Sequence, residues 1–156
     1  MKILGIDPGL QICGYAVIEA DRNQTKLLEA GVCRTDPKKP IEKRLVQIAQ
    51  DINLLLEKFK PACVAVEDLY SHYSHPKTAI LMGHARGVIL AQACKVGTDV
   101  KSFAATRIKK SLTGNGRASK LQVQRSIKSL LCLANVPEPP DVADAIAVAL
   151  CCANMI

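Results

Sequence analysis

Residues 2–9 read Lys-Ile-Leu-Gly-Ile-Asp-Pro-Gly, and the prediction of the fold starts from this stretch. Its apolar half predicts a short buried strand, and the proline and glycine predict a turn directly after Asp7. Two more apolar segments, residues 13–20 and 26–35, flank a short polar segment and predict a hairpin. We therefore expect Asp7 at the end of a central strand of a sheet.

The rest of the chain alternates helices and strands. Apolar residues recur at helical spacing in residues 41–59, whereas residues 62–67 form a nearly all-apolar run, which is typical of a buried central strand. The other expected elements are a helix at 77–95, a strand at 100–103, and helices at 104–112, 118–132 and 141–154. This order predicts an α/β fold, with a mixed five-stranded sheet and helices on both faces.

Length and composition favour one globular domain. The chain has 156 residues, 49% of them hydrophobic, which is enough for a single core, so we expect one domain over residues 1–156. No uninterrupted apolar run reaches the roughly 18 residues of a membrane span. The first residues do not have the pattern of a signal peptide, so a cytoplasmic location is expected.

The cysteines and histidines are interpreted as ordinary residues. There are seven cysteines, an odd number, and no two have Cys-x-x-Cys spacing, so we expect buried, reduced thiols. The three histidines, His72, His75 and His84, have no suitable cysteine nearby. We expect them to be solvated or near nucleic acid, and not zinc ligands.

Positive charge is concentrated in one part of the chain. The net charge is +7, and residues 101–135, called the basic segment below, contain eight basic residues and no acid. The eight are Lys101, Arg107, Lys109, Lys110, Arg117, Lys120, Arg125 and Lys128. Such a segment favours a polyanionic partner, nucleic acid first, although an ordinary solvated surface is the alternative.

Four acids are expected to form one site. Asp7 and Glu67 each end an apolar strand, and Asp141 and Asp144 are three residues apart at the start of a helix, so they share a face. Clustered carboxylates repel one another unless a cation neutralises them, and their hard oxygens suit Mg²⁺ or Mn²⁺. Two such ions can promote the hydrolysis of a phosphodiester.

Each acid also has a simpler interpretation. Asp7 could be a turn residue before proline, Glu67 a surface acid at a strand end, and Asp141 a helix N-cap. Asp144 is harder to dismiss because its neighbours along the helix are apolar. Spacing alone does not prove that the four acids converge.

Five short motifs occur in order along the chain. They are Gly5-Ile6-Asp7-Pro8-Gly9 with Gly14-Tyr15, then Ala65-Val66-Glu67, then Ala85-Arg86-Gly87, then Lys109-Lys110-Ser111-Leu112-Thr113-Gly114-Asn115-Gly116, and last Asp141-Val142-Ala143-Asp144-Ala145. Together they resemble the bacterial RuvC family of Holliday junction resolvases over essentially the whole chain. Single motifs are weak, since an Asp-x-Gly turn also occurs in actin-like ATPases, but the ordered set is highly specific.

The resemblance implies a fold and an activity. It implies a ribonuclease-H-like fold and a homodimer that makes paired, symmetric nicks in four-way junction DNA during recombination and repair, leaving ligatable 5′-phosphate ends. It implies a RuvA–RuvB branch-migration complex as partner. From the carboxylate chemistry described above we expect two Mg²⁺ ions per site, with Mn²⁺ able to substitute. The four catalytic acids of the family map onto Asp7, Glu67, Asp141 and Asp144.

The resemblance also assigns other residues. Two lysines that serve the scissile strand map onto Lys109 and Lys120, and an aromatic residue that stacks on a base maps onto Tyr70. The residues expected to bind DNA are Tyr70, Arg107, Lys109, Lys110, Gly114, Gly116, Arg117 and Lys120. Backbone amides at the two glycines would approach a phosphate. The simpler interpretations are a plain helix–helix turn for the glycine loop and a half-buried aromatic for Tyr70.

Three rival functions were weighed. They are a junction-binding protein without nuclease activity, a nuclease for single strands or RNA on the same fold, and a fragment of an actin-like ATPase. The four acids argue against the first, and the chain is too short to supply the second domain that the third requires. The dimer is expected to form through the helix at 77–95, because its many small residues allow close approach.

Overall fold

The computed structural model describes residues 1–69 and 76–155, so the predictions for Tyr70, His72 and His75 fall outside the described residues. In the described part the strands are β1 (Lys2–Asp7), β2 (Ile12–Ala20), β3 (Thr25–Arg34), β4 (Cys63–Glu67) and β5 (Asp99–Phe103). The helices are α1 (Ile41–Phe59), α2 (Pro76–Lys95), α3 (Ala105–Thr113), α4 (Lys120–Leu130) and α5 (Pro140–Ala153). Every expected element is present.

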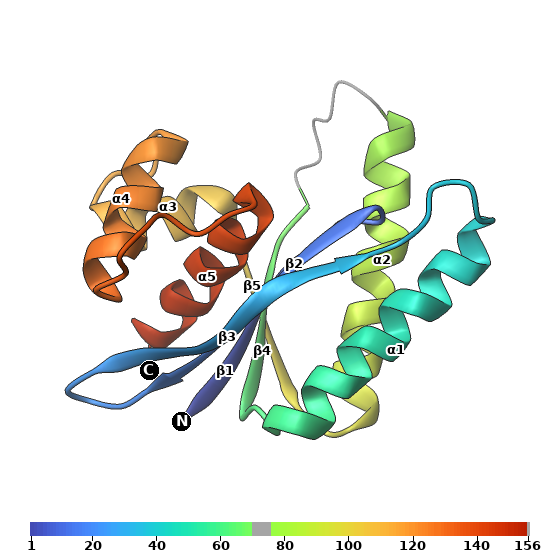
Figure 1. Ribbon diagram of the computed structural model, residues 1–156, viewed down its shortest axis with the longest axis horizontal. Helices are drawn as coiled ribbons and strands as arrows, with labels where there is room; N and C mark the ends of the chain where they lie inside the picture. Colours follow the sequence, from blue (N-terminus) through green and yellow to red (C-terminus); the bar gives the residue numbers. More distant parts are fainter. Residues whose placement is uncertain (70–75, 156) are drawn as a thin grey trace.

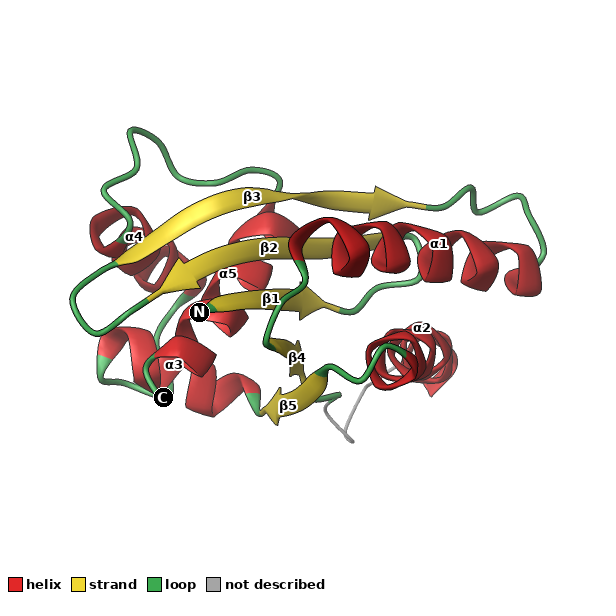
Figure 2. Ribbon diagram, turned by 90° about the horizontal axis from the view of Figure 1, so that it is seen from below, coloured by secondary structure: helices red, strands yellow, loops and turns green. Residues whose placement is uncertain are grey.

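The strands form one mixed sheet in the order β3-β2-β1-β4-β5 (Figure 2). β1 and β2 pair antiparallel, as do β2 and β3, whereas β1, β4 and β5 run parallel. Ile6 pairs with Val66, so the next residues, Asp7 and Glu67, end neighbouring parallel strands at the same edge. The sheet topology therefore brings two of the acids to one place.

Helices cover both faces of the sheet, as predicted (Figure 1). On one face, α1 and α2 pack on buried residues of β1 and β4 that include Leu4, Ile6 and Val64. On the other face, α3, α4 and α5 pack on a core that includes Ile3 and Ala65. Because side chains alternate along a strand, Asp7 and Glu67 project on the second face, the one that carries α5.

Helix α5 lies unusually close to the sheet. Every residue from 145 to 152 is buried, as expected for a helix that is apolar all round. A Cβ added at Gly5 would overlap the carbonyl oxygen of Ala145, and one added at Gly14 would overlap that of Asp141. Gly14 is also the cross-strand partner of Asp7. These two glycines therefore let the start of α5 approach Asp7.

The ends of two helices differ from the prediction. Helix α4 begins at Lys120, not at residue 118, because the Ser119 side chain accepts a hydrogen bond from the Gln122 amide at 3.3 Å and acts as N-cap. Helix α5 begins at Pro140, with Pro139 as the N-cap residue. Asp141 lies inside the first turn, so its interpretation as an N-cap is wrong.

All seven cysteines lie in the described residues and are free thiols. Five are buried, as expected, but Cys94 and Cys132 are exposed, so burial was predicted wrongly for these two. Among the described residues, no helix has the length and apolar character needed to cross a membrane.

Candidate functional site

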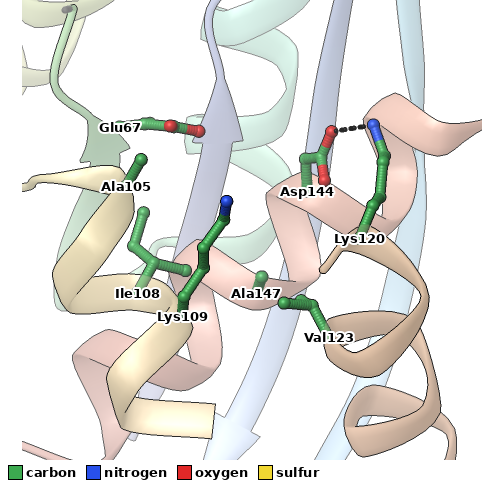
Figure 3. Close-up of a pocket in the computed structure, with 8 residues that line it drawn as sticks. All are labelled: Glu67, Ala105, Ile108, Lys109, Lys120, Val123, Asp144 and Ala147. Atoms are coloured by element: carbon green, nitrogen blue, oxygen red, sulfur yellow. Dashed lines mark hydrogen bonds and ion pairs between the residues drawn. The ribbon is translucent and has the colours of Figure 1, made fainter. Parts of the chain in front are cut away.

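A pocket of about 240 Å³ opens at the edge of the sheet where β4 ends. Two acids and two lysines of the predicted set line it: Glu67 from β4, Asp144 from α5, Lys109 from α3 and Lys120 from α4 (Figure 3). Its apolar wall consists of Ala105, Ile108, Val123 and Ala147. Four elements, β4, α3, α4 and α5, therefore meet around one cavity that is lined by both signs of charge.

Asp7 is the most strongly perturbed acid of this group. Its pKa is raised to about 7, first by burial and then by the negative charges of Asp144, Glu67 and Asp141, while Lys120 opposes them. Each of the other three predicted acids is thus close enough to act on Asp7. This electrostatic coupling is the structural observation that links all four acids.

Glu67 is affected by the same neighbours. Its pKa is raised, first by burial and then by Asp144, whereas Lys109 and Lys120 lower it. In Figure 3, Glu67 and Lys109 point into the pocket from one side. The lysines therefore reduce, without removing, the cost of placing an acid here.

Lys120 and Asp144 form an ion pair on the other side of the pocket (Figure 3). The Lys120 Nζ donates to Asp144 Oδ2 at 2.8 Å. This hydrogen bond is the main reason that the pKa of Lys120 is raised, and the charges of Asp144, Asp7 and Asp141 add to it. Lys120 is the first residue of α4, so the Ser119 cap fixes the point from which the lysine reaches the acids.

The donor set fits a hard divalent cation. Among the described residues, no three Asp, Glu, His or Cys side chains lie together as a ready-made ligand group. The chemistry is nevertheless right, because the neighbouring carboxylates raise the pKa of Asp7 and Asp144 raises that of Glu67, and a cation would relieve this repulsion in place of a proton. Asp7, Glu67, Asp141 and Asp144 are the residues that would hold it.

The other predicted DNA-binding residues that the structure describes do not line the pocket. Arg107, Lys110 and Arg117 are exposed on α3 and the loop that follows. The Gly114 amide already donates to the Lys110 carbonyl oxygen at 2.9 Å, because Gly114 caps α3 in the left-handed conformation. The expected contact between this amide and a phosphate is therefore not supported. Gly116 packs against the start of α3, near the Thr106 carbonyl oxygen.

Two features of this region were missed by sequence reasoning. One is the apolar wall, because residues such as Ile108 and Val123 look like ordinary core positions at helical spacing. The other is Arg86 on α2, which donates hydrogen bonds to the chain at the end of β4. Arg86 stands in the Ala-Arg-Gly motif, so a signal was present, but spacing does not reveal what an arginine touches. His84 is an exposed residue of α2.

Comparisons with known proteins agree with this geometry. The family described as crossover junction endodeoxyribonuclease RuvC matches residues 3–152. A relative of that name from Rhodopirellula baltica is 48% identical over 96% of this chain and 84% of its own length. Another from Heliobacterium modesticaldum is 42% identical over 100% of this chain and 96% of its own length.

Solved structures give the same result. Thermus thermophilus RuvC in complex with a Holliday junction substrate superposes with a TM-score of 0.92 at 32% identity, covering 97% of this chain and 92% of that one. The yeast mitochondrial Holliday junction resolvase Ydc2, at 16% identity and a TM-score of 0.68, shares the fold. The chain has the ribonuclease-H-like fold of these resolvases, and it belongs to the RuvC family of crossover junction endodeoxyribonucleases.

Proposed function

We propose that this protein is a metal-dependent endonuclease that resolves Holliday junctions by paired, symmetric nicks in recombination and repair. The observation that carries the proposal is the coupling of Asp7 to Glu67, Asp141 and Asp144 beside a pocket lined by two lysines. A family whose members carry the name crossover junction endodeoxyribonuclease supplies the substrate class. Residues 1–156 would act as a single nuclease domain.

The four carboxylates are proposed to hold Mg²⁺, two ions per site, with Mn²⁺ able to substitute. Divalent cations bound there would supply charge stabilisation to a phosphodiester and a reactive water. The charge that the acids now place on one another would be neutralised, so Asp7 would lose its affinity for a proton. The hydrolysis breaks the bond between phosphorus and the 3′ oxygen and leaves a 5′ phosphate.

The chain's own residues position the scissile phosphate and its charge. Lys120 donates a hydrogen bond to Asp144, and its ammonium group would be free to turn towards the phosphate if Asp144 helped to hold a cation. Lys109, which lies near Glu67, would approach from the opposite side (Figure 3). Donors placed in advance around developing negative charge lower a barrier effectively. The apolar wall formed by Ile108, Val123 and Ala147 would exclude water from this side of the pocket.

Paired nicks require two sites, which we propose are supplied by a homodimer. The partner surface is proposed to be α2, since its Ile80 is 61% exposed and an added side chain at Gly87 would meet no atom within 4 Å. Unlike α1, α2 has apolar residues on more than the side that packs on the sheet. A two-fold dimer matches the two-fold symmetry of a four-way junction.

The remaining partners and the location are proposals as well. The basic segment, including Arg107, Lys110 and Arg117, is proposed to contact junction phosphates, with Gly116 close to them. Tyr70 is proposed to stack on a base near the junction centre. We further propose cooperation with a RuvA–RuvB branch-migration complex, and action in the cytoplasm, where seven free thiols would stay reduced.

A nicking assay tests the function. A labelled mobile four-way junction is incubated with the protein in Mg²⁺, Mn²⁺ or EDTA, and the products are resolved on a denaturing gel. Nicks at symmetric positions on opposite strands, in the metal samples alone, are expected. Tight junction binding without nicks in either metal would instead indicate a junction-binding protein without nuclease activity. Faster cleavage of single strands or RNA–DNA hybrids than of junctions would overturn the substrate assignment.

A further inference from the structure

Arg86 connects three elements next to the four predicted acids, which are called the acid site below: Asp7, Glu67, Asp141 and Asp144. It lies on α2, on the sheet face opposite α5, and its side chain is 20% exposed. Its Nε donates to the Glu67 carbonyl oxygen at 3.3 Å. One terminal nitrogen donates to Asp68 Oδ1 at 3.0 Å and to Ser102 Oγ of β5 at 2.7 Å. A single guanidinium thus joins α2 to the ends of β4 and β5.

The contact with Glu67 is made to its main chain. β4 ends at Glu67, and one further main-chain hydrogen bond to β5 follows, from the Asp68 amide to the Phe103 carbonyl oxygen at 2.9 Å. The last residues of a strand tend to fray because few neighbours hold them. Arg86 supplies a hydrogen bond where the ladder stops, at the residue whose side chain enters the pocket.

Asp68 and Ser102 determine where the guanidinium lies. The planar fork of arginine can donate to several acceptors in a fixed geometry, whereas lysine offers a point charge without a fork. With one nitrogen held by Asp68 and Ser102, the Nε proton is aimed at the Glu67 carbonyl oxygen. The same bond to Arg86 holds Asp68, the acid next to Glu67 in sequence.

We propose that Arg86 is a positioning residue that fixes the end of β4, so that the Glu67 carboxylate is held where the cations bind. The inference rests on the proposed function in taking Glu67 as a metal-holding acid. Arg86 touches neither substrate nor the reacting atoms, and it acts through the Glu67 backbone. Residues that orient metal ligands from behind typically contribute about 10- to 100-fold to metal affinity or activity.

Direct Mn²⁺ binding tests this inference without DNA. Binding is measured by electron paramagnetic resonance on wild type, Arg86→Gln, Arg86→Lys, Glu67→Gln and the double variant Arg86→Gln/Glu67→Gln. Arg22→Gln, in the exposed β2–β3 turn, is the matched control for charge. Arg86→Gln is expected to bind Mn²⁺ about tenfold more weakly. Arg86→Lys should recover little, because it keeps the charge and loses the fork.

The double variant separates positioning from a general structural role. If Arg86 acts through Glu67, its substitution should weaken binding by less than about twofold once Glu67 is already glutamine. The same tenfold loss in both backgrounds, or wild-type affinity in Arg86→Gln, would overturn the proposal. Circular dichroism of the metal-free proteins reports folding, and if Arg86→Gln does not fold, the same comparison is made with Arg86→Lys.

The result also remains distinct from failure of the proposed function. Wild-type protein that binds Mn²⁺ but does not nick junctions would contradict the nuclease, while the Arg86 comparison would still decide the inference. Wild-type protein that nicks junctions, together with Arg86→Gln that binds Mn²⁺ normally, would contradict the inference alone.

Discussion

The acid site and the basic segment carry opposite charges and hold them in different ways. Asp7 and Glu67 are half-buried, and each has its pKa raised by burial and by other acids. In the basic segment, residues such as Arg107, Lys110 and Arg117 are exposed. Charges in water act nearly independently because they are screened, whereas half-buried charges depend on one another. Substitutions should therefore have large, coupled effects in the acid site, and small, additive effects at the exposed residues of the basic segment outside the pocket.

The largest effect is expected from Asp7→Asn. Losing a carboxylate that we propose holds the cation should remove several kcal/mol of transition-state stabilisation, which is about a 10³-fold loss of junction nicking at saturating Mg²⁺. Junction binding in EDTA should stay at or above the wild-type level, because a negative charge near the DNA has been removed. Single-turnover nicking and gel-shift titrations measure the two quantities. A parallel loss of binding would break the distinction between the two regions.

The second effect is the stability of the metal-free protein as a function of pH. The pKa of Asp7 is about 7 in the folded protein, against an ordinary 3.8, so the folded state holds this proton over a wider pH range. The contribution of this proton to the stability of the folded state is complete below about pH 4 and is lost as the pH rises through about 7. We therefore compare the unfolding free energies of wild type and Asp7→Asn in EDTA. As the pH rises from about 4 to about 8, the difference between them should shift by on the order of 3 kcal/mol in favour of the variant.

Urea unfolding at several pH values between about 4 and 8 measures this difference. Mg²⁺ at the upper end of the range should stabilise the wild type and leave Asp7→Asn nearly unchanged, because the cation takes the place of the proton. A constant difference between the two proteins across this range would mean that Asp7 titrates as an ordinary surface acid.

The fold was predictable because local signals agreed with one another. The apolar runs around Ile6 and Val66, each ending at an acid, marked the central strands, and helical spacing marked α1. The helix starts were less predictable. Ser119 caps α4 through a side-chain hydrogen bond, and Pro140 is the first residue of α5. Because residues of similar type lie nearby, the sequence alone does not decide which of them begins each helix.

The site was predictable only in part. The spacing of Asp141 and Asp144 indicated one helix face, but their proximity to Asp7 depends on the contact of α5 with β1 and β2. The bond that occupies the Gly114 amide and the contacts of Arg86 depend on side-chain and backbone geometry that no spacing encodes. Sequence thus identified the charged residues, while the structure was needed to show how they are held.

The third prediction concerns the close approach of the start of α5 to β2 at Gly14. Gly14→Ala places a Cβ against the Asp141 carbonyl oxygen, which is main chain and cannot rotate away. Overpacking of this kind costs about 1–3 kcal/mol, and pushing the start of α5 outward should also lower nicking. Gly83→Ala is the control, because its Cβ meets only Leu69 at 3.8 Å and lies inside a helix. Thermal unfolding should show a loss for the first variant and none for the second.

The smallest effect is expected in the basic segment, from Lys110→Gln. Lys110 is exposed on α3 outside the pocket, so its loss should weaken junction binding a few-fold and reduce the slope of log K against log salt by about 1. Nicking at saturating junction should not change. Lys43→Gln, on α1 across the sheet, makes the same charge change and should leave the slope unaltered. If Lys110→Gln instead slowed nicking of bound junction, an exposed charge would be acting inside the acid site, and the independence attributed to the basic segment would not hold.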